Sequence, residues 1–241
     1  MLKNRILFYI QARGGSKRIP NKNIKNFLGK PLIAYAINQA LACKIKGRVI
    51  VDTDSKKIAA IAKKYGAETP WLRPAYLASD SAQGVDSLIY LLNRLKKEES
   101  YEPDYIIILQ ITSPLREIED ITDCWKMMQK TKANTILTIC PTHPRLYYLK
   151  KNNDITLVNG SEANSTNVQD WPPAYILNGC FVYIVKTKAL LKEKKVITKK
   201  TKAVVCPNWR SIDLDNPEDW AMAELICKNK NNIIKKIKNF K

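Results

Sequence analysis

The chain has 241 residues, 45% of them hydrophobic, which is typical of a globular protein that can bury a sizeable core. No apolar run approaches the ~20 residues of a membrane-spanning helix, so the sequence argues against a helical membrane protein. The formal net charge of +19 is compatible with nucleic acid as a binding partner. The excess lysine gathers at residues 186–202 and 228–241, without the repeated aromatic residues on which bases stack. We therefore interpret it as solvated surface and a frayed basic tail.

The first 140 residues alternate short apolar runs with segments of helical periodicity. Strands are predicted at residues 5–12, 48–53, 104–112 and 133–140, and helices at residues 31–45, 55–68, 85–99 and 118–131. Ser55 is placed as the N-cap of the second helix and Gly66 as its stop. This order predicts an α/β fold, a single mostly parallel twisted sheet with helices on both faces, in one domain over residues 1–227.

The pattern changes after residue 140. Residues 145–160 hold two strand-like runs around an Asn-Asn-Asp turn, which predicts a hairpin. Further strands are predicted at residues 174–186 and 202–207, and a helix at residues 215–229 with Asn216 as its N-cap and Pro217 next. Residues 141–175 are expected to form an insert outside the main sheet, and residues 228–241 a basic C-terminal tail.

The six cysteine residues are scattered along the chain and form no C-x-x-C pair. Most lie in apolar segments, and the N-terminal segment lacks the pattern of a signal peptide. Both features favour reduced, buried thiols in a cytoplasmic protein over a disulfide framework.

A glycine-rich basic turn, "ARGGSKRIPNKN", follows the first predicted strand. Ligands of parallel α/β sheets bind beyond the carboxyl ends of the strands. Gly14 and Gly15 allow backbone N–H groups to approach an anion, and cationic side chains can grip phosphate. The cations of the turn are Arg13, Lys17, Arg18 and Lys22. The turn therefore predicts a phosphate-rich ligand, although neither a P-loop nor a G-x-G-x-x-G motif is present.

Asp213 and Asp215 are two residues apart on a segment expected to be a strand, which would place both carboxylates on one face. Such a pair suits Mg²⁺, which prefers one or two carboxylates together with substrate phosphates. The alternative is that each carboxylate pairs with a lysine, and that Asp215 helps to cap the following helix.

Six segments occur in an order that resembles the acylneuraminate cytidylyltransferase (CMP-sialic acid synthetase) family. They are "ARGGSKRIPNKN", "VDTDSKKIAAIAKKYGAE", "LRPAYLASD", "LQITSPLR", "NG" at 178–179 and "IDLDNPED". The resemblance spans roughly residues 6–225 and implies a nucleotide-diphospho-sugar transferase-like domain. It implies a homodimer in which the insert reaches the partner subunit. The implied reaction joins CTP to a nonulosonic, sialic-type acid, giving the CMP-sugar for surface glycans and pyrophosphate.

The resemblance also implies roles for individual residues. The catalytic cations would be Arg13 and Lys17. The CTP contacts would be Arg13, Ser16, Lys17, Lys22, Asn23, Arg73, Asp80 and Ser81. The sugar-acid contacts would be Gln110, Thr112, Ser113, Asn178 and Tyr183. Asp213 and Asp215 would hold Mg²⁺.

The chain departs from the family pattern at three places. Gln11 replaces the usual proline, Asp52 stands where "STDS" begins, and "NGCFVY" carries one residue more than usual before Tyr183. These departures leave the sugar open: legionaminate, pseudaminate and 3-deoxy-manno-octulosonate are alternatives to sialate. A basic nucleic-acid-binding protein is the alternative from another class, and neither nucleic acid nor a membrane is the expected partner.

Overall fold

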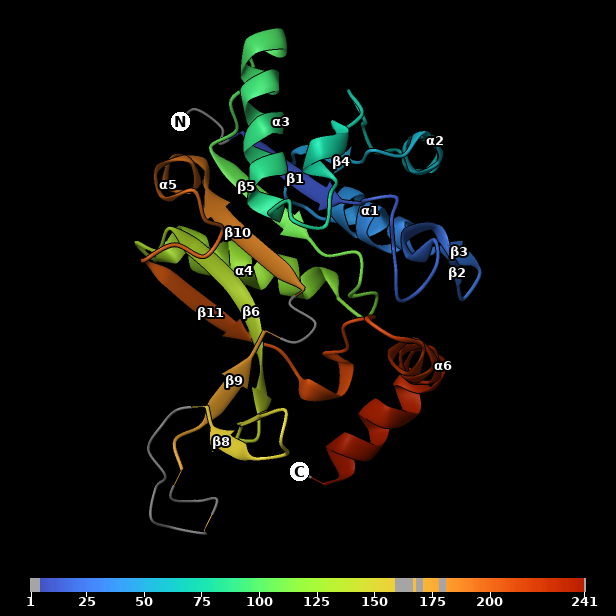
Figure 1. The fold of residues 1–241 in the computed structure, drawn as a ribbon, viewed down its shortest axis with the longest axis vertical. Helices are drawn as coiled ribbons and strands as arrows, with labels where there is room; N and C mark the ends of the chain where they lie inside the picture. Colours follow the sequence, from blue (N-terminus) through green and yellow to red (C-terminus); the bar gives the residue numbers. More distant parts are fainter. Residues whose placement is uncertain (1–4, 159–166, 168–170, 178–180, 241) are drawn as a thin grey trace.

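The computed structural model describes residues 5–158, 167, 171–177 and 181–240 (Figure 1). Its centre is a seven-stranded sheet whose main path runs β11-β6-β10-β5-β1-β4. These strands are Thr201–Val205, Thr135–Thr142, Val182–Lys186, Tyr105–Leu109, Ile6–Gln11 and Arg48–Asp52. The seventh, β9 (Ala174–Ile176), pairs with the end of β6. Only β10 runs antiparallel to its neighbours on the main path, so the predicted mostly parallel sheet is confirmed.

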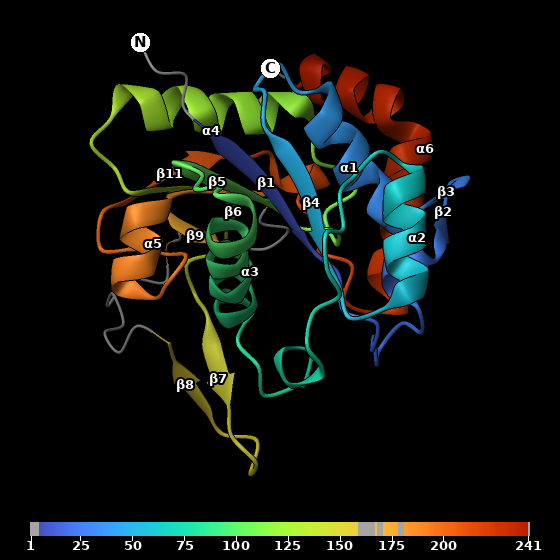
Figure 2. The same cartoon turned by 90° about the horizontal axis from the view of Figure 1, so that it is seen from above.

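Helices cover both faces of the sheet, as predicted (Figure 2). One face carries α1 (Leu32–Ala42), α2 (Lys56–Lys64), α4 (Ile118–Lys130) and α6 (Pro217–Asn239), and the other carries α3 (Gly84–Glu99) and α5 (Thr187–Glu193). Within the described part of the chain, no helix combines the length and hydrophobicity of a membrane span. Short elements complete the chain: 3-10 helices Lys22–Ile24, Ala75–Leu77 and Asn208–Arg210, and the paired strands β2 (Asn26–Phe27) and β3 (Lys30–Pro31).

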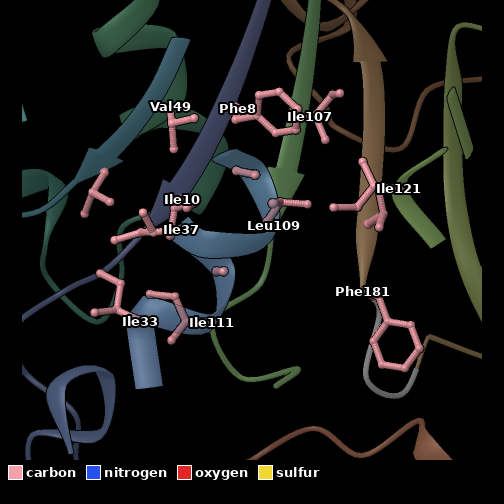
Figure 3. Packing of buried hydrophobic residues seen from close by; sticks show 14 of the residues in the cluster. Phe8, Ile10, Ile33, Ile37, Val49, Ile107, Leu109, Ile111, Ile121 and Phe181 are labelled. Carbon is pink, nitrogen blue, oxygen red and sulfur yellow. The ribbon is translucent and has the colours of Figure 1, made fainter. Parts of the chain in front are cut away.

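Strand β1 contributes side chains to two separate hydrophobic cores because its residues alternate between faces. Phe8 and Ile10 are buried against α1, where Ile37 packs (Figure 3). Leu7 and Tyr9 are buried in the opposite core with residues of α3. A strand buried on both faces reads as a continuous apolar run, which is why β1 could be predicted.

Part of the expected insert forms the hairpin predicted at residues 145–160, while the two ends of the insert belong to β6 and β9 of the main sheet. Strands β7 (Tyr147–Leu149) and β8 (Ile155–Leu157) pair with each other and with no strand of the main sheet. Figure 2 shows the hairpin projecting away from the layers.

Three local predictions were wrong. Residues 174–186 form two strands, because the Thr138 hydroxyl accepts from the N–H groups of Phe181 and Val182 in place of backbone pairing. The segment around Asp213 and Asp215 is not a strand: the Asp215 N–H donates locally to the Asp213 carbonyl. The basic tail is not frayed, since α6 continues to Asn239. Helix α5 was not foreseen.

Candidate active site

A cavity of about 580 Å³ opens beyond the carboxyl ends of β1 and β4. Two loops form most of its wall, the basic turn after β1 and the segment between α2 and α3. Among its lining residues are Arg13, Ser16, Lys17, Arg18, Lys22, Asn23, Arg73, Ser79, Gly84 and Asp215. Six of the eight residues expected to contact CTP are therefore brought together; Asp80 and Ser81 do not line this cavity.

The basic turn is held by contacts to its own backbone. The Gly14 N–H donates to Asp54 Oδ1 at 2.8 Å, and the buried Asn23 side chain donates to the Arg13 carbonyl at 2.9 Å. A Cβ atom on Gly14 would lie 3.3 Å from the Cβ of Ser55. A side chain at this position would therefore be tight against the residue before α2. The Gly14 N–H is already used by Asp54 and does not face an anion.

Asp80 holds two cations of the turn. Its carboxylate lies 2.9 Å from Arg13 Nη1 and 2.5 Å from Lys17 Nζ. The hydrogen bond from Lys17, followed by that from Arg13, lowers the pKa of Asp80 below its ordinary value. An anion entering the cavity must compete with this carboxylate for both cations.

Asp215 makes the corresponding contacts at the other end of the turn. It lies 2.9 Å from Arg18 Nη1 and 3.5 Å from Lys22 Nζ, so Asp215 has the lysine neighbour that the alternative expected, with an arginine closer to it. Lys22 also donates to the Leu214 carbonyl at 2.6 Å, which ties the basic turn to the acidic segment.

Asp213 is less exposed than Asp215. Its Oδ1 atom is buried and has no hydrogen-bond partner among the described residues. Burial raises the pKa of Asp213 above its ordinary value. The Thr112 hydroxyl and Lys22 act against this rise, and the nearby Asp215 carboxylate adds to it. The described residues contain no group of three or more metal-ligating side chains. An orphaned carboxylate oxygen beside a second carboxylate nevertheless suits a hard cation that takes its other ligands from phosphates.

A second cavity of about 370 Å³ adjoins the first, and Gln11 and Gly84 line both. A Cβ atom on Gly84 would lie 2.8 Å from Gln11 Oε1, so the glycine makes room for this shared side chain. Of the expected sugar contacts, Gln110 and Tyr183 line the second cavity, whereas the half-buried Thr112 and the buried Ser113 do not. Asn178 lies outside the described residues.

The second cavity also contains residues that sequence reasoning missed. Lys194 and Lys195 line it together with Val196 and Ile197, and none of its lining residues in the described part of the chain is acidic. These lysines were assigned to solvated surface because they belong to a lysine-rich run. Their position depends on α5, whose seven residues gave no clear periodic signal.

Comparisons with known proteins agree with this geometry. A cytidylyltransferase family model matches residues 7–209. CMP-N,N'-diacetyllegionaminic acid synthase of Legionella pneumophila is 34% identical over 227 residues, which are 91% of this chain and 95% of that protein. Pseudaminic acid cytidylyltransferase of Campylobacter jejuni is 31% identical, over 92% of this chain and 96% of its own. The fold matches that of a CMP:2-keto-3-deoxy-manno-octonic acid synthetase complexed with CTP, with a TM-score of 0.68, 16% identity, and coverage of 94% and 99% of the two chains.

Proposed function

Because this chain belongs to the acylneuraminate cytidylyltransferase family, we propose that it transfers the cytidylyl group of CTP to a nonulosonic acid, giving the CMP-sugar and pyrophosphate. The observation that carries the proposal is the pair of adjoining cavities, which share Gln11 and Gly84. One suits a nucleoside triphosphate and the other a sugar acid. Their shared wall is where the two reacting groups would meet.

The nucleotide would occupy the cationic cavity. Its triphosphate would displace Asp80 from Arg13 and Lys17, since a multiply charged phosphate chain attracts these cations more strongly than one carboxylate does. The buried Arg73 also lines this cavity and would face the cytosine base. In this arrangement the carboxylate of Asp80 is a counterion of the empty site and not a contact to the base.

The sugar acid would occupy the second cavity. Gln110 and Tyr183 offer hydrogen bonds to hydroxyl groups, and Val196 and Ile197 offer an apolar surface. Lysine side chains line this cavity, and the described residues contribute no acidic side chain to it, which favours a negatively charged substrate. The names of the relatives support the nonulosonic acids as a class, without selecting one member.

The reaction is an in-line displacement at the α-phosphorus. The anomeric hydroxyl oxygen forms the new P–O bond and its proton is lost to solvent, while the bond to the β-phosphate breaks and pyrophosphate leaves with the electron pair. Arg13 and Lys17 would neutralise the charge that gathers on pyrophosphate, which is mainly a matter of positioning and electrostatics. A Mg²⁺ ion held by Asp213 and Asp215 would supply Lewis-acid stabilisation of phosphate charge when bound.

The test is release of pyrophosphate from CTP in the presence of single sugar acids. N-acetylneuraminic, legionaminic, pseudaminic and 3-deoxy-manno-octulosonic acids form the panel. We expect release that requires both CTP and one of the nine-carbon acids, with the eight-carbon acid far slower. Release with none of the four acids would refute the proposed function. Equal release with UTP, ATP and GTP would refute the assignment of the base site.

A further inference from the structure

A buried ion pair lies beneath the floor of the cationic cavity. Asp52 at the end of β4 and Arg73 are each only 5% exposed. Arg73 Nε donates to Asp52 Oδ2 at 3.0 Å, and Arg73 Nη2 donates to the Asp52 carbonyl at 2.7 Å while lying 2.9 Å from the same Oδ2. One aspartate therefore occupies two of the three guanidinium nitrogens with both its side chain and its backbone.

The ion pair is fixed from below by a chain of hydrogen bonds. The Tyr9 hydroxyl donates to Asp52 Oδ2 at 2.6 Å and lies 3.2 Å from Ser87 Oγ, to which Gln11 Nε2 donates at 2.9 Å. Burial, followed by the charge of Asp52, raises the pKa of Tyr9 well above its ordinary value, so the phenol keeps its proton and remains a donor. The chain thus links Asp52 to Gln11, which lines both cavities.

The remaining guanidinium nitrogen, Arg73 Nη1, makes no hydrogen bond to any residue that the structure describes. Arg73 lines the cationic cavity, so the donors of this nitrogen are left for a ligand. A buried guanidinium keeps a single orientation when its other nitrogens are satisfied, and its charge is tolerated because a carboxylate compensates it. The ion pair therefore holds Arg73 in one orientation in the wall of the cationic cavity, with the donors of Nη1 unused by the described residues.

We propose that Asp52 is a positioning residue for nucleotide selection: it holds Arg73 so that Nη1 donates to the acceptor edge of the pyrimidine base. Cytosine presents O2 and N3 as neighbouring acceptors, whereas N3 of uracil carries a proton. A donor fixed at this edge therefore favours CTP over UTP, and a donor free to rotate discriminates less. This inference rests on the proposed function for the identity of the nucleotide.

The experiment compares Asp52→Asn with wild type by calorimetric binding of CTP and UTP, and by steady-state kinetics. Asparagine keeps the shape but loses the charge and one strong acceptor. We expect CTP affinity to fall about 10-fold or more, the size of effect that loss of a hydrogen bond to a charged group produces. The ratio of CTP to UTP affinity should fall with it. The KM for the sugar acid should stay within about 2-fold, because Asp52 does not line the second cavity.

Asp120→Asn is the matched control. Asp120 forms another buried ion pair, with both oxygens 2.7 Å from Arg210, and neither residue lines either cavity. This variant should lose stability as Asp52→Asn does, while its CTP affinity and CTP-to-UTP ratio remain those of wild type. Similar binding losses in both variants, or an unchanged ratio in Asp52→Asn, would overturn the proposal.

Tyr9→Phe keeps the proposal falsifiable if Asp52→Asn does not fold. It removes one hydrogen bond to Asp52 and leaves the charge, so we expect a smaller drop in the same ratio; an unchanged ratio in a folded Tyr9→Phe would then overturn the proposal. CTP binding is measured without sugar acid, so a failure of the positioning role of Asp52 can be told apart from a failure of the proposed function. CTP binding without turnover would refute the proposed function alone, and absence of CTP binding in wild type would refute both.

Discussion

Arg13 and Lys17 are the side chains whose removal should separate activity from folding. Their side chains are 42% and 74% exposed, so Arg13→Ala and Lys17→Ala should cost little stability. We expect each to lower kcat/KM by about 10²-fold or more, as for loss of one group that stabilises transition-state charge. Lys63→Ala, an exposed lysine on α2, is the control. Near-normal turnover in both variants, with unchanged circular dichroism, would make the turn an ordinary surface loop.

Asp213 and Asp215 can be tested by titrating the rate against Mg²⁺. If they hold the ion, Asp213→Asn should fold, require more Mg²⁺ and recover partly at high concentration, and chelation should abolish wild-type activity. Asp213 offers the clearer test, because no described residue forms a hydrogen bond with its buried Oδ1, whereas Asp215 already pairs with Arg18. Superimposable Mg²⁺ curves for wild type and Asp213→Asn would exclude Asp213 as a ligand.

The cations of the site could be predicted from the sequence, but their counterions could not. A glycine-rich run of Arg and Lys behind an apolar strand is a local signal. Asp80 lies 67 residues from its partner Arg13, and Lys22 donates to a carbonyl 192 residues away. Nothing in the sequence near Asp80 distinguishes a counterion from a contact to the base, because the pairing exists only once the loops are folded together.

The projecting hairpin is the element that we expect to contact a second copy of the chain. Tyr148, Leu149 and Ile155 are 63%, 71% and 61% exposed, an apolar surface that an isolated two-stranded hairpin leaves uncovered. Leu149→Asp combined with Ile155→Asp should convert a dimer to a monomer, as measured by light scattering after size exclusion. Leu225→Asp, at an exposed leucine of α6, should leave the mass unchanged. A wild-type monomer would contradict the expected homodimer.

Elements with long periodic or continuous apolar patterns were predictable, and those defined by side-chain contacts were not. The helix after Ser55 begins as expected, since the Ser55 hydroxyl accepts from the Ile58 N–H. The break between β9 and β10 depends on the Thr138 hydroxyl, 43 residues before Phe181. The length of α6 was underestimated because its lysine and asparagine residues suggested a solvated tail. Helix propensity and the cap at Asn216 were sufficient to carry it further.

The sheet order explains at the scale of the whole molecule why the basic turn is the site. Strand β1 lies between β4 and β5, so the chain proceeds to one side after β1 and later returns to the other. Such a reversal leaves a crevice at the carboxyl end of the strand where it occurs. The sequence predicted parallel strands but not which strands are neighbours, because apolar strands of similar length can pair in several orders.

The positive charge of the whole molecule could attract CTP without a specific site. Thermal shifts with different ligands distinguish this non-specific binding from binding in the cationic cavity. CTP at about 100 times its dissociation constant should stabilise the fold by about 2.7 kcal/mol, which raises Tm by about 5–10 °C for a domain of this size. Tripolyphosphate offers the same charge without a base and should give a smaller shift at equal concentration, because it makes no contact to Arg73. Arg13→Ala should reduce both shifts. With a net charge of +19, non-specific binding would instead give equal shifts for the two ligands, both lost steeply with salt, and duplex DNA would then stabilise the chain as well as CTP does.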